Sequence, residues 1–511
     1  MTGLLMSLLV AQGLFAKAYG VNSPGGFRET IFSVIQTPDG GFLVGAENGN
    51  DSGGVMARID PGGNVLWADL FWGGWEAFTR VIPTSDGGYA GVISSIGGAF
   101  SEAIKVNSAG TLQWRYDYEW LSNIELWSIV QSTDGGYALG GWGWASDGNT
   151  DPIIVKLSST GAVQWARSIG GAALPELDYA YSMVLTSDGG YAILGEMSTG
   201  DLILAKLTSA PAIQWAVSIG GPGYEDCSSP NELIQTLDGG YAISAYTQSY
   251  GAGGQDWLVV KLDGSGNLVW ARAIGGTGDD QAAGITQTAD GGYAVCGGTG
   301  SFGAGSWDLM VVKLDGSGNL SWARTLGGTD SDGAYSVIQT SDGGYALGGF
   351  TFSYGAGGQD WLLMRLDANG NYPDCVLDCV PTVNNVSPTV SALSLTLTAQ
   401  SVTRFSSEAP VAHTPAVYDI CTPLYAGEDG HGPGSRVACS PLPGAVLFIA
   451  PDDLPLRIYS PDGRLTWSGN LKKGQNRISL ETGVYFWRAG GECGGAGAPA
   501  YPLDSGKAVV R

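Results

Sequence analysis

The sequence predicts an all-β protein built from repeated four-stranded units, and three observations carry this prediction. Asp-Gly-Gly followed by Phe or Tyr occurs seven times at intervals of 47 to 54 residues, a period typical of repeat architectures. Tryptophan recurs at one position in six of the repeats. Apolar residues make up 44% and charged residues 14% of the 511 residues, which fits a well-buried β protein and not a disordered chain. The seven phrases begin at Asp39, Asp86, Asp134, Asp188, Asp238, Asp290 and Asp342.

Each repeat divides into two hairpins. Residues 335–350 are two β-prone runs around Asp342-Gly343-Gly344, and Asp-Gly and Gly-Gly supply the positive φ angles of a tight turn. A second hairpin is clearest in residues 256–272, around Gly264-Ser265-Gly266. Four antiparallel strands in a unit of this length form a propeller blade. The chain is therefore expected to form a seven-bladed β-propeller over residues 13–372.

The fourth strand of the repeat predicts how the ring closes. Its tryptophan occurs only six times, at Trp67, Trp114, Trp165, Trp215, Trp270 and Trp322. Residues 14–20 are similar to residues 321–327, with Phe15 at the tryptophan position. An open ring would leave an unpaired edge strand, which is an aggregation hazard. We therefore expect an N-terminal strand to complete the last blade and close the propeller.

Two features near the ends of the chain predict export. Residues 1–12 hold an uncharged apolar run that is too short to span a membrane and is typical of a signal-peptide core. No later stretch reaches the ~18 apolar residues of a transmembrane helix. Five of the seven cysteines follow the repeats, where disulfides would suit an exported chain. Cys227 and Cys296, in separate repeats, are expected to be small buried residues.

The C-terminal third has no repeat. Residues 373–445 are rich in Pro, Ser and Thr and contain cysteines, and they are interpreted as a linker. Residues 446–511 form a compact β module, expected to be a small β-sandwich. Its predicted strands lie in residues 456–464, 474–480, 483–488 and 506–511.

Two resemblances extend this interpretation. The Asp-Gly-Gly-Tyr units resemble those of secreted bacterial and archaeal propeller-type surface proteins, over residues 13–372. Residues 446–511, with Ile458-Tyr459, Gly483-Val484-Tyr485-Phe486 and a basic end, resemble the type IX secretion sorting domain. The resemblance implies that secretion machinery recognises this module and that the protein is secreted or displayed on the outer cell surface. The 263–266 hairpin is also similar to the tryptophan-docking motif of quinoprotein propellers, with Asp263 and Gly266 one residue closer together.

The side chains available for chemistry limit the function classes. The only histidines are His413 and His431, in the predicted linker, so the repeats hold no Ser-His-Asp triad and no His-ligated metal. The net charge of −24 disfavours nucleic acid as a partner. Asp256 and Asp308, like their equivalents in other repeats, are interpreted as structural. Acidic loops that follow fourth strands supply hard oxygen ligands that suit calcium; the alternative is that they are only solvated. The candidate calcium ligands are Glu225, Asp226, Asp279, Asp280, Asp330 and Asp332.

Tryptophans outside the repeat pattern are the candidate binding residues. Exposed aromatic rings can stack on sugar rings, so these side chains predict a glycan-binding surface; packing between blades is the alternative. They are Trp72, Trp75, Trp120, Trp127, Trp142 and Trp144. The sequence therefore favours a secreted or cell-surface, non-enzymatic propeller that acts in binding, adhesion or surface structure, with a glycan or surface protein as partner. The alternative is a carbohydrate-active enzyme, a glycosidase or lyase, that uses paired carboxylates. A quinone-dependent dehydrogenase is the third reading.

Overall fold

A computed structural model describes most of the chain. It covers residues 14–20, 29–49, 53–72, 76–95, 100–119, 123–144, 149–170, 178–355, 358–372, 377–379, 381–393, 396–400, 403–406, 411–412, 416–419, 438–442, 445–450, 454–459, 465–471, 474–479, 483–489 and 504–510. All regular elements in these ranges are β-strands, which confirms the all-β prediction. The chain divides into two compact units, Met1–Cys421 and Thr422–Arg511.

The first unit consists of consecutive groups of four antiparallel strands, which we call repeats 1 to 7. Repeat 1 is β2 (Glu29–Gln36), β3 (Phe42–Asn48), β4 (Gly53–Ile59) and β5 (Val65–Trp72). Repeat 2 is β6 (Glu76–Pro83), β7 (Tyr89–Ser95), β8 (Phe100–Val106) and β9 (Leu112–Glu119). Repeat 3 is β10 (Ile124–Gln131), β11 (Tyr137–Trp144), β12 (Thr150–Leu157) and β13 (Val163–Gly170). Repeat 4 is β14 (Tyr179–Leu185), β15 (Tyr191–Glu196), β16 (Leu202–Leu207) and β17 (Ile213–Gly220).

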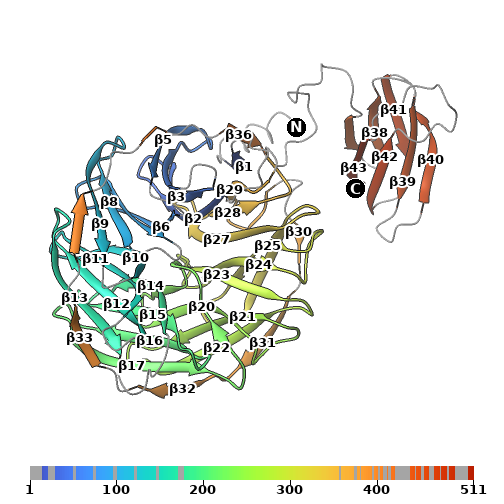
Figure 1. Cartoon of the computed structure of the whole chain (residues 1–511). Helices are drawn as coiled ribbons and strands as arrows, with labels where there is room; N and C mark the ends of the chain where they lie inside the picture. Colours follow the sequence, from blue (N-terminus) through green and yellow to red (C-terminus); the bar gives the residue numbers. More distant parts are fainter. Residues whose placement is uncertain are drawn as a thin grey trace. The chain divides into compact units, whose positions relative to one another are not determined.

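The later repeats follow the same order with two variations. Repeat 5 has a divided first strand, β18 (Glu225–Asp226) and β19 (Leu233–Gln235), followed by β20 (Tyr241–Thr247), β21 (Asp256–Leu262) and β22 (Leu268–Gly275). Repeat 6 is β23 (Asp280–Gln287), β24 (Tyr293–Thr299), β25 (Asp308–Leu314) and β26 (Leu320–Leu326). Repeat 7 is β27 (Asp332–Gln339), β28 (Tyr345–Thr351) and β29 (Asp360–Leu366), completed by β1 (Phe15–Gly20). Figure 1 shows these groups set around a common centre, with β2, β6, β10, β14, β23 and β27, the first strands of six repeats, innermost.

The Asp-Gly-Gly phrases form the turns between the first and second strands, as predicted. The first glycine of each phrase has φ between 78° and 86°, a conformation that residues with a Cβ rarely adopt. At the second glycine, as at Gly240, a Cβ would lie 2.3 Å from the carbonyl oxygen of Leu262. Both glycines are therefore required by the local backbone.

The sheets are propeller-like, but their boundaries differ in one place from the prediction of one sheet per repeat. Repeats 1 and 2 belong to a single ten-stranded sheet, because Glu47 of β3 pairs with Ala77 of β6. Repeats 3 to 7 each lie in a sheet of their own. The bulk of the antiparallel pairing therefore lies within a repeat, with one added link between the first two.

The N-terminal strand lies where the sequence predicts it. β1 pairs with β29 in antiparallel register, with Phe15 opposite Arg365 and Tyr19 opposite Trp361. Phe15 is 5% exposed and contacts the ring of Phe42 edge-on, at 5.8 Å between centroids. In five other repeats the fourth-strand tryptophan meets the tyrosine of the next phrase edge-on in the same way, as in Trp270 with Tyr293 at 5.6 Å. Phe15 thus replaces the tryptophan between repeats 7 and 1.

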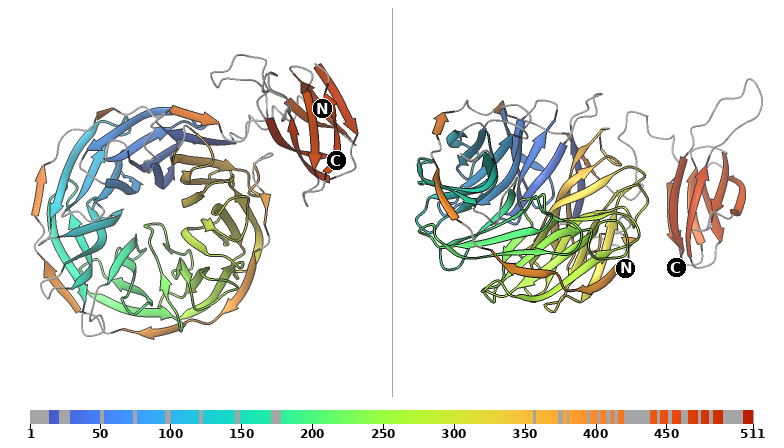
Figure 2. Two further views of the ribbon diagram at one scale, coloured as in Figure 1. Left: turned by 45° about the vertical axis from the view of Figure 1, so that its right-hand side comes forward. Right: turned by 60° about the horizontal axis from the view of Figure 1, so that its bottom comes forward.

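The segment predicted as a linker contributes an additional strand to each repeat. It runs through the repeats in the order 6, 5, 4, 3, 2, 1 and 7, pairing with β26, β22, β17, β13, β9, β5 and β1. We call these seven strands the belt: β30 (Leu377–Asp378), β31 (Thr382–Val386), β32 (Thr389–Ala392), β33 (Thr396–Gln400), β34 (Thr403–Ser406), β35 (Val411–Ala412) and β36 (Ala416–Asp419). They appear in orange on the outer rim (Figure 2). The first compact unit thus ends at Cys421, not at residue 372. The belt strands pair through backbone hydrogen bonds, and a few of their side chains, such as Val383 and Val390, pack against the core. Such short strands leave little pattern in the sequence.

The second compact unit contains two antiparallel sheets. One has the order β37 (Ala438–Leu442), β38 (Ala445–Ala450) and β41 (Gly474–Ser479); the other has the order β40 (Leu465–Leu471), β39 (Leu454–Tyr459), β42 (Gly483–Ala489) and β43 (Asp504–Val510). Strands are therefore present at all four predicted positions, and β37, β38 and β40 are additional. The pair β42–β43 is continuous from Gly483 opposite Val510 to Ala489 opposite Asp504.

Two sequence predictions concern cysteines and membrane spans. Cys227 and Cys296 are free and buried, as expected. Cys439 lies in β37, and Cys375, Cys421 and Cys493 lie outside the described residues. Within the described part of the chain, no helix is long and apolar enough to cross a membrane.

Candidate functional site

The aspartate of each Asp-Gly-Gly phrase is part of the scaffold. It forms an ion pair with a Lys or Arg on the third strand of its own repeat, and that cation is buried. The pairs are Asp39–Arg58, Asp86–Lys105, Asp134–Lys156, Asp188–Lys206, Asp238–Lys261, Asp290–Lys313 and Asp342–Arg365. At Asp188 the hydroxyl of Thr186, the Lys206 ammonium and the Gly190 N–H lower the pKa to about 2. These carboxylates are fully ionised at neutral pH and already have partners, so they are poor candidates for catalysis.

Three of the predicted calcium ligands are buried and hold their own loops. Glu225 accepts hydrogen bonds from the Gly221 N–H at 2.7 Å and the Thr247 hydroxyl at 2.6 Å. Asp280 occupies the equivalent position in repeat 6 and Asp332 in repeat 7, and each also accepts a backbone N–H from the preceding glycine pair. Each of these carboxylates therefore has a structural role at the start of a repeat.

The other three predicted ligands differ from one another. Asp279 and Asp330 are exposed, and Asp279 accepts the Gln255 N–H at 3.0 Å. Asp226 is half-buried and accepts the hydroxyl of Tyr246. Among the described residues, no group of three or more His, Cys, Asp or Glu side chains is placed to hold a metal ion.

The predicted tryptophans are only partly brought together. Trp127 of β10 contacts Tyr181 edge-on at 5.2 Å, and Trp142 of β11 contacts Tyr179 at 4.8 Å. Both indoles are half-buried, and their Nε1 atoms are buried without a hydrogen-bond partner among the described residues. Trp144, two residues beyond Trp142, is 39% exposed. Trp72 lies in β5, where its side chain is not described, and Trp75 and Trp120 lie outside the described residues.

A pair of carboxyl groups adjoins these rings. Tyr179 lies opposite Glu196 in the β14–β15 pair, and the Tyr181 hydroxyl donates to Glu196 Oε1 at 3.3 Å. Burial and the neighbouring Asp226 carboxyl, which shares a hydrogen bond with it, raise the pKa of Glu196 to about 9. The rings of Trp127 and Trp142 with Tyr179, Tyr181, Glu196 and Asp226 form what we call the aromatic–acid cluster. Sequence reasoning missed Glu196, because its repeat position holds glutamate only in repeats 1 and 4 and other residue types in the remaining repeats.

A loop in repeat 5 crosses the centre of the first unit. The first strand of this repeat is interrupted by residues 227–232, three residues longer than the equivalent stretch of repeat 6. Asn231 Nδ2 donates to the carbonyl oxygens of Phe32 at 2.6 Å and Tyr335 at 3.1 Å. The carbonyl of Pro230 accepts the Ser182 hydroxyl at 2.8 Å and the Arg80 guanidinium. The loop therefore connects repeat 5 with repeats 1, 2, 4 and 7. The longer spacing between Glu225 and Gln235 was the available sequence signal.

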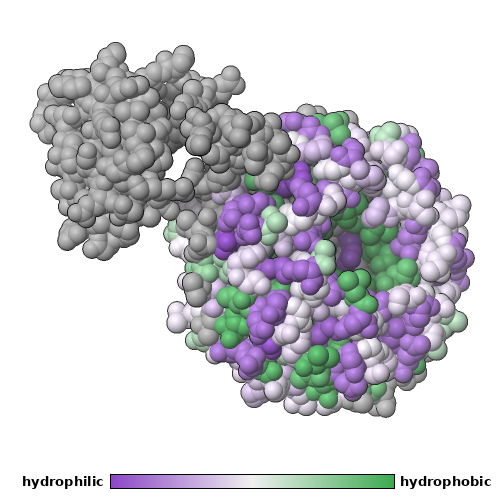
Figure 3. Space-filling view, turned by 180° about the vertical axis from the view of Figure 1, so that it is seen from behind, coloured by the Kyte–Doolittle hydropathy of each residue, from purple (hydrophilic) through white to green (hydrophobic). Residues whose placement is uncertain are grey.

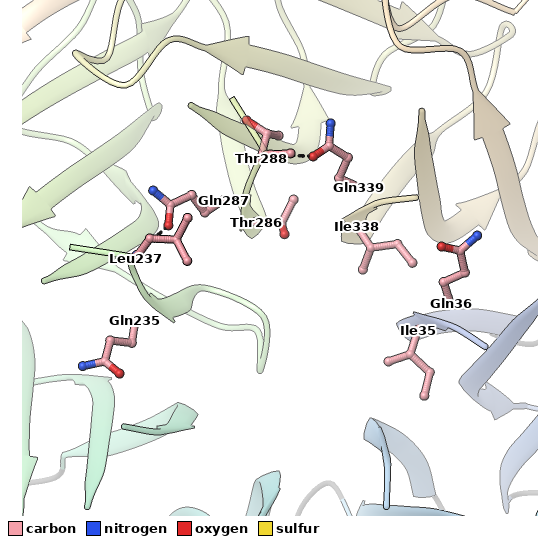
Figure 4. Close-up of a pocket in the computed structure, with 10 residues that line it drawn as sticks. Ile35, Gln36, Gln235, Leu237, Thr286, Gln287, Thr288, Ile338 and Gln339 are labelled. Atoms are coloured by element: carbon pink, nitrogen blue, oxygen red, sulfur yellow. Dashed lines mark hydrogen bonds between the residues drawn. The ribbon is translucent and has the colours of Figure 1, made fainter. Parts of the chain in front are cut away.

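A pocket of about 570 Å³ opens at the ends of the first strands, beside the Asp-Gly-Gly turns. It is lined by glutamine amides and apolar side chains, among them Gln36, Gln287, Gln339, Ile35, Ile338 and Leu237 (Figure 4). The glutamines also connect repeats: Gln287 Oε1 accepts the Leu237 N–H at 2.8 Å. The space-filling view shows a hollow near the centre of this unit, with hydrophobic and hydrophilic colours on its walls (Figure 3).

The pocket and the aromatic–acid cluster lie at opposite ends of the strands. Gln36 and Gln287 are the last residues of β2 and β23, next to the Asp-Gly-Gly turns. Glu196 is the last residue of β15 and Trp142 lies near the end of β11, both far from those turns. The first unit therefore offers two separate candidate binding regions.

Comparisons with known proteins show structural likeness only. No family model matches the chain, and no curated protein matches it. The chain is similar to a protein of unknown function from Dyadobacter fermentans, with 12% identity and a TM-score of 0.42 over 69% of this chain and 98% of that one. It is also similar to a protein of unknown function from Bacteroides caccae, with 14% identity and a TM-score of 0.34 over 50% of this chain and 93% of that one.

Proposed function

We propose that the repeats form one closed, seven-bladed β-propeller. The contacts between repeats 7 and 1 support this, because they repeat those between other neighbours. The Val34 N–H donates to Ser336 Oγ at 3.1 Å, and the Ser341 N–H donates to Gln36 Oε1 at 2.8 Å. The same glutamine contact joins repeats 6 and 7, from Ala289 to Gln339. A closed ring leaves no unpaired strand edge between the last and the first repeat, so a neighbouring chain cannot add a strand there.

The proposed activity of this propeller is non-catalytic binding, with a glycan as the ligand. The single observation that carries it is the grouping of the half-buried rings of Trp127 and Trp142 with two tyrosines. An aromatic face contributes apolar contact to a sugar ring. Trp144, exposed beside them, would extend the same surface.

The alternative, a carbohydrate-active enzyme, draws on Glu196 and Asp226. A raised pKa is what a general acid requires. Glycosidase carboxyl groups, however, stand about 5–10 Å apart so that substrate or water fits between them. Glu196 and Asp226 share a hydrogen bond, and tyrosine hydroxyls occupy further positions on them. This geometry favours a half-buried structural pair over a catalytic one.

Binding of the full-length protein to an array of immobilised oligosaccharides tests this proposal, with Trp144→Ala and Trp142→Ala as variants. Both should lose affinity by about tenfold or more, as expected for an aromatic residue central to an interface. Leu66→Ala is the matched control, because Leu66 is an exposed apolar residue, 57% exposed, in repeat 1. Binding that all three variants retain would exclude the cluster as the site.

The enzymatic alternative needs its own measurement. The wild-type protein and Glu196→Gln are incubated with a panel of polysaccharides, and new reducing ends or unsaturated products are measured. No turnover is expected from either protein. Turnover by the wild type that Glu196→Gln abolishes would replace the non-catalytic proposal with the enzymatic one.

We also propose that the protein is secreted or displayed at the outer cell surface. The support is in the sequence: an apolar run in residues 1–12 and a C-terminal module that resembles the type IX secretion sorting domain. Residues 446–511 fused to a fluorescent protein should be exported by a host with that secretion machinery, and the same fusion ending at residue 503, without β43, should not. Retention of both fusions inside the cell would contradict the assignment.

A further inference from the structure

Two junctions between neighbouring repeats each bring two buried carboxyl groups together. Asp256 begins the third strand of repeat 5, and Asp280 begins the first strand of repeat 6. They are 1% and 0% exposed. A Cβ placed on Gly275 would lie 2.0 Å from Asp256 Oδ1 and 2.7 Å from Asp280 Oδ2. The two oxygens therefore border the same small space.

The hydrogen bonds at this junction leave one oxygen unused. Asp280 accepts the Gly276 N–H at 2.8 Å, the Ser301 hydroxyl at 2.7 Å and the Thr299 hydroxyl. Asp256 Oδ2 accepts the N–H groups of Ala252 at 3.1 Å and Gly253 at 3.2 Å. Asp256 Oδ1 is buried and has no hydrogen-bond partner among the described residues. The groups that donate to these carboxyls are all neutral, and burial together with the neighbouring Asp280 carboxyl raises the pKa of Asp256.

The next junction repeats the arrangement. Asp308 Oδ2 accepts the Gly305 N–H at 3.0 Å, while its Oδ1 is buried and has no partner among the residues that the structure describes. Asp332, which begins repeat 7, accepts the Gly328 N–H at 2.9 Å and the Ser353 hydroxyl at 2.7 Å. A Cβ on Gly327 would lie 1.5 Å from Asp308 Oδ1. The unused oxygen is therefore a feature of this type of junction and not of one loop.

Backbone carbonyl groups adjoin both pairs. A Cβ on Gly253, whose N–H donates to Asp256, would lie 2.6 Å from the carbonyl oxygens of both Gly276 and Gly278. In the next junction the equivalent Gly305 would meet the carbonyl oxygens of Asp330 at 2.4 Å and Gly328 at 2.9 Å. Each junction thus brings the oxygen atoms of two carboxyl groups and two backbone carbonyls into the same loops.

We propose that each of these two junctions binds one calcium ion, with Asp256 Oδ1 and Asp308 Oδ1 as direct ligands. Two adjacent buried carboxylates repel each other, and no Lys or Arg among the described residues forms an ion pair with Asp256 or Asp308. A divalent cation removes that repulsion and fills the vacant coordination of the unused oxygen. Oxygen ligands of mixed carboxylate and carbonyl type suit calcium, and a site with only two carboxylates belongs in the weak, extracellular range of affinity.

The proposed calcium ligands differ from those expected from the sequence. Asp280 and Asp332 remain in the proposed sites, where they supply the second negative charge. Asp256 and Asp308, interpreted from sequence as structural, become the direct ligands. The proposal does not depend on the glycan-binding function, because the aromatic–acid cluster lies in repeats 3 to 5 and shares none of these four residues.

Calcium titration of the full-length protein by calorimetry is the direct test. The wild type should bind two calcium ions, Asp256→Asn and Asp308→Asn one each, and the double variant none at these sites. Asp263→Asn is the matched control, since Asp263 caps an exposed turn of the same repeat by accepting the Ser265 and Asn267 N–H groups. Two ions bound by the double variant, or none bound by the wild type, would overturn the proposal.

Thermal unfolding provides a second readout that does not depend on a titration signal. In chelator the double variant should unfold at the same temperature as the wild type or higher, because each substitution removes one of two repelling charges. In millimolar calcium the wild type should gain stability, since a ligand that binds only the folded state raises the midpoint, and the double variant should not. An equal calcium shift in both proteins would show that the ion binds elsewhere and would refute the assignment.

Discussion

The ion pair between Asp238 and Lys261 predicts an unequal response to removing either partner. The Lys261 side chain is 4% exposed, whereas that of Asp238 is 65% exposed, and their charged atoms are 3.0 Å apart. Lys261 Nζ also donates to the Leu262 carbonyl at 2.8 Å. Asp238→Asn keeps an oxygen that can accept from Thr236 and Gly240, so it removes the charge without removing the turn.

The expected loss in the free energy of unfolding depends on how deeply the remaining charged partner is buried. Breaking a buried pair by removing one partner costs about 3–5 kcal/mol, and an exposed pair is worth about 0–1 kcal/mol. Asp238→Asn leaves a buried ammonium that retains two acceptors, the Leu262 carbonyl and the amide oxygen of the new side chain, so we expect the free energy of unfolding to fall by about 3 kcal/mol, at the lower end of the buried case. Lys261→Met leaves an exposed carboxylate that water solvates, so we expect the free energy of unfolding to fall by only about 1 kcal/mol.

Urea unfolding of the first compact unit, followed by tryptophan fluorescence, measures both losses. The double variant Asp238→Asn with Lys261→Met should lie close to Lys261→Met alone, because the buried charge is gone from both. Asp263→Asn, at an exposed turn of the same repeat, is the control and should cost less than Asp238→Asn. A greater loss in Lys261→Met than in Asp238→Asn would refute the reasoning.

Three further predictions concern the belt, Glu196 and the central loop. A chain that ends at Tyr372 lacks the belt and should unfold at a lower temperature and self-associate, because exposed strand edges pair with other chains; light scattering should find the chain that ends at Cys421 monomeric. The raised pKa of Glu196 means that its contribution to stability is complete below pH 4.5 and is lost as the pH rises towards 9, so the unfolding temperature should fall over this range in the wild type and fall less in Glu196→Gln. Asn231→Ala should destabilise the unit by about 1–2 kcal/mol by leaving two carbonyls unsatisfied, whereas Asn267→Ala, on an exposed turn, should cost less in the same urea assay.

The sequence predicts the elements that depend on local chemistry. Asp-Gly-Gly needs only its own backbone to form a turn, so every such hairpin could be placed from the sequence. The N-terminal strand could be placed because Phe15 stands where the repeat has tryptophan. Its contact with Phe42 reproduces the ring geometry found between other repeats. Both predictions are possible because particular residue types recur at a fixed position within each repeat.

Other features depend on contacts between distant segments and could not be predicted. The Lys206–Asp188 and Lys261–Asp238 pairs span 18 and 23 residues, because the loop between the second and third strands varies in length. The belt strands pair through backbone groups, which any sequence without proline can supply. Asn231 reaches Phe32 across 199 residues, and nothing near Asn231 in the sequence indicates this partner.

The order of pairing around β1 has a consequence for folding. β1 is the first described strand of the chain, but its two neighbours are β29 and β36. Its sheet is therefore incomplete until residues 416–419 have been synthesised. Contacts with such large sequence separation form slowly, because the entropy of closing the intervening loop is lost before they contribute. Repeats 1 to 6 can form their four-strand groups earlier, since their partners are adjacent in sequence. Repeat 7 and the belt must therefore be the last parts of the first unit to reach their final pairing.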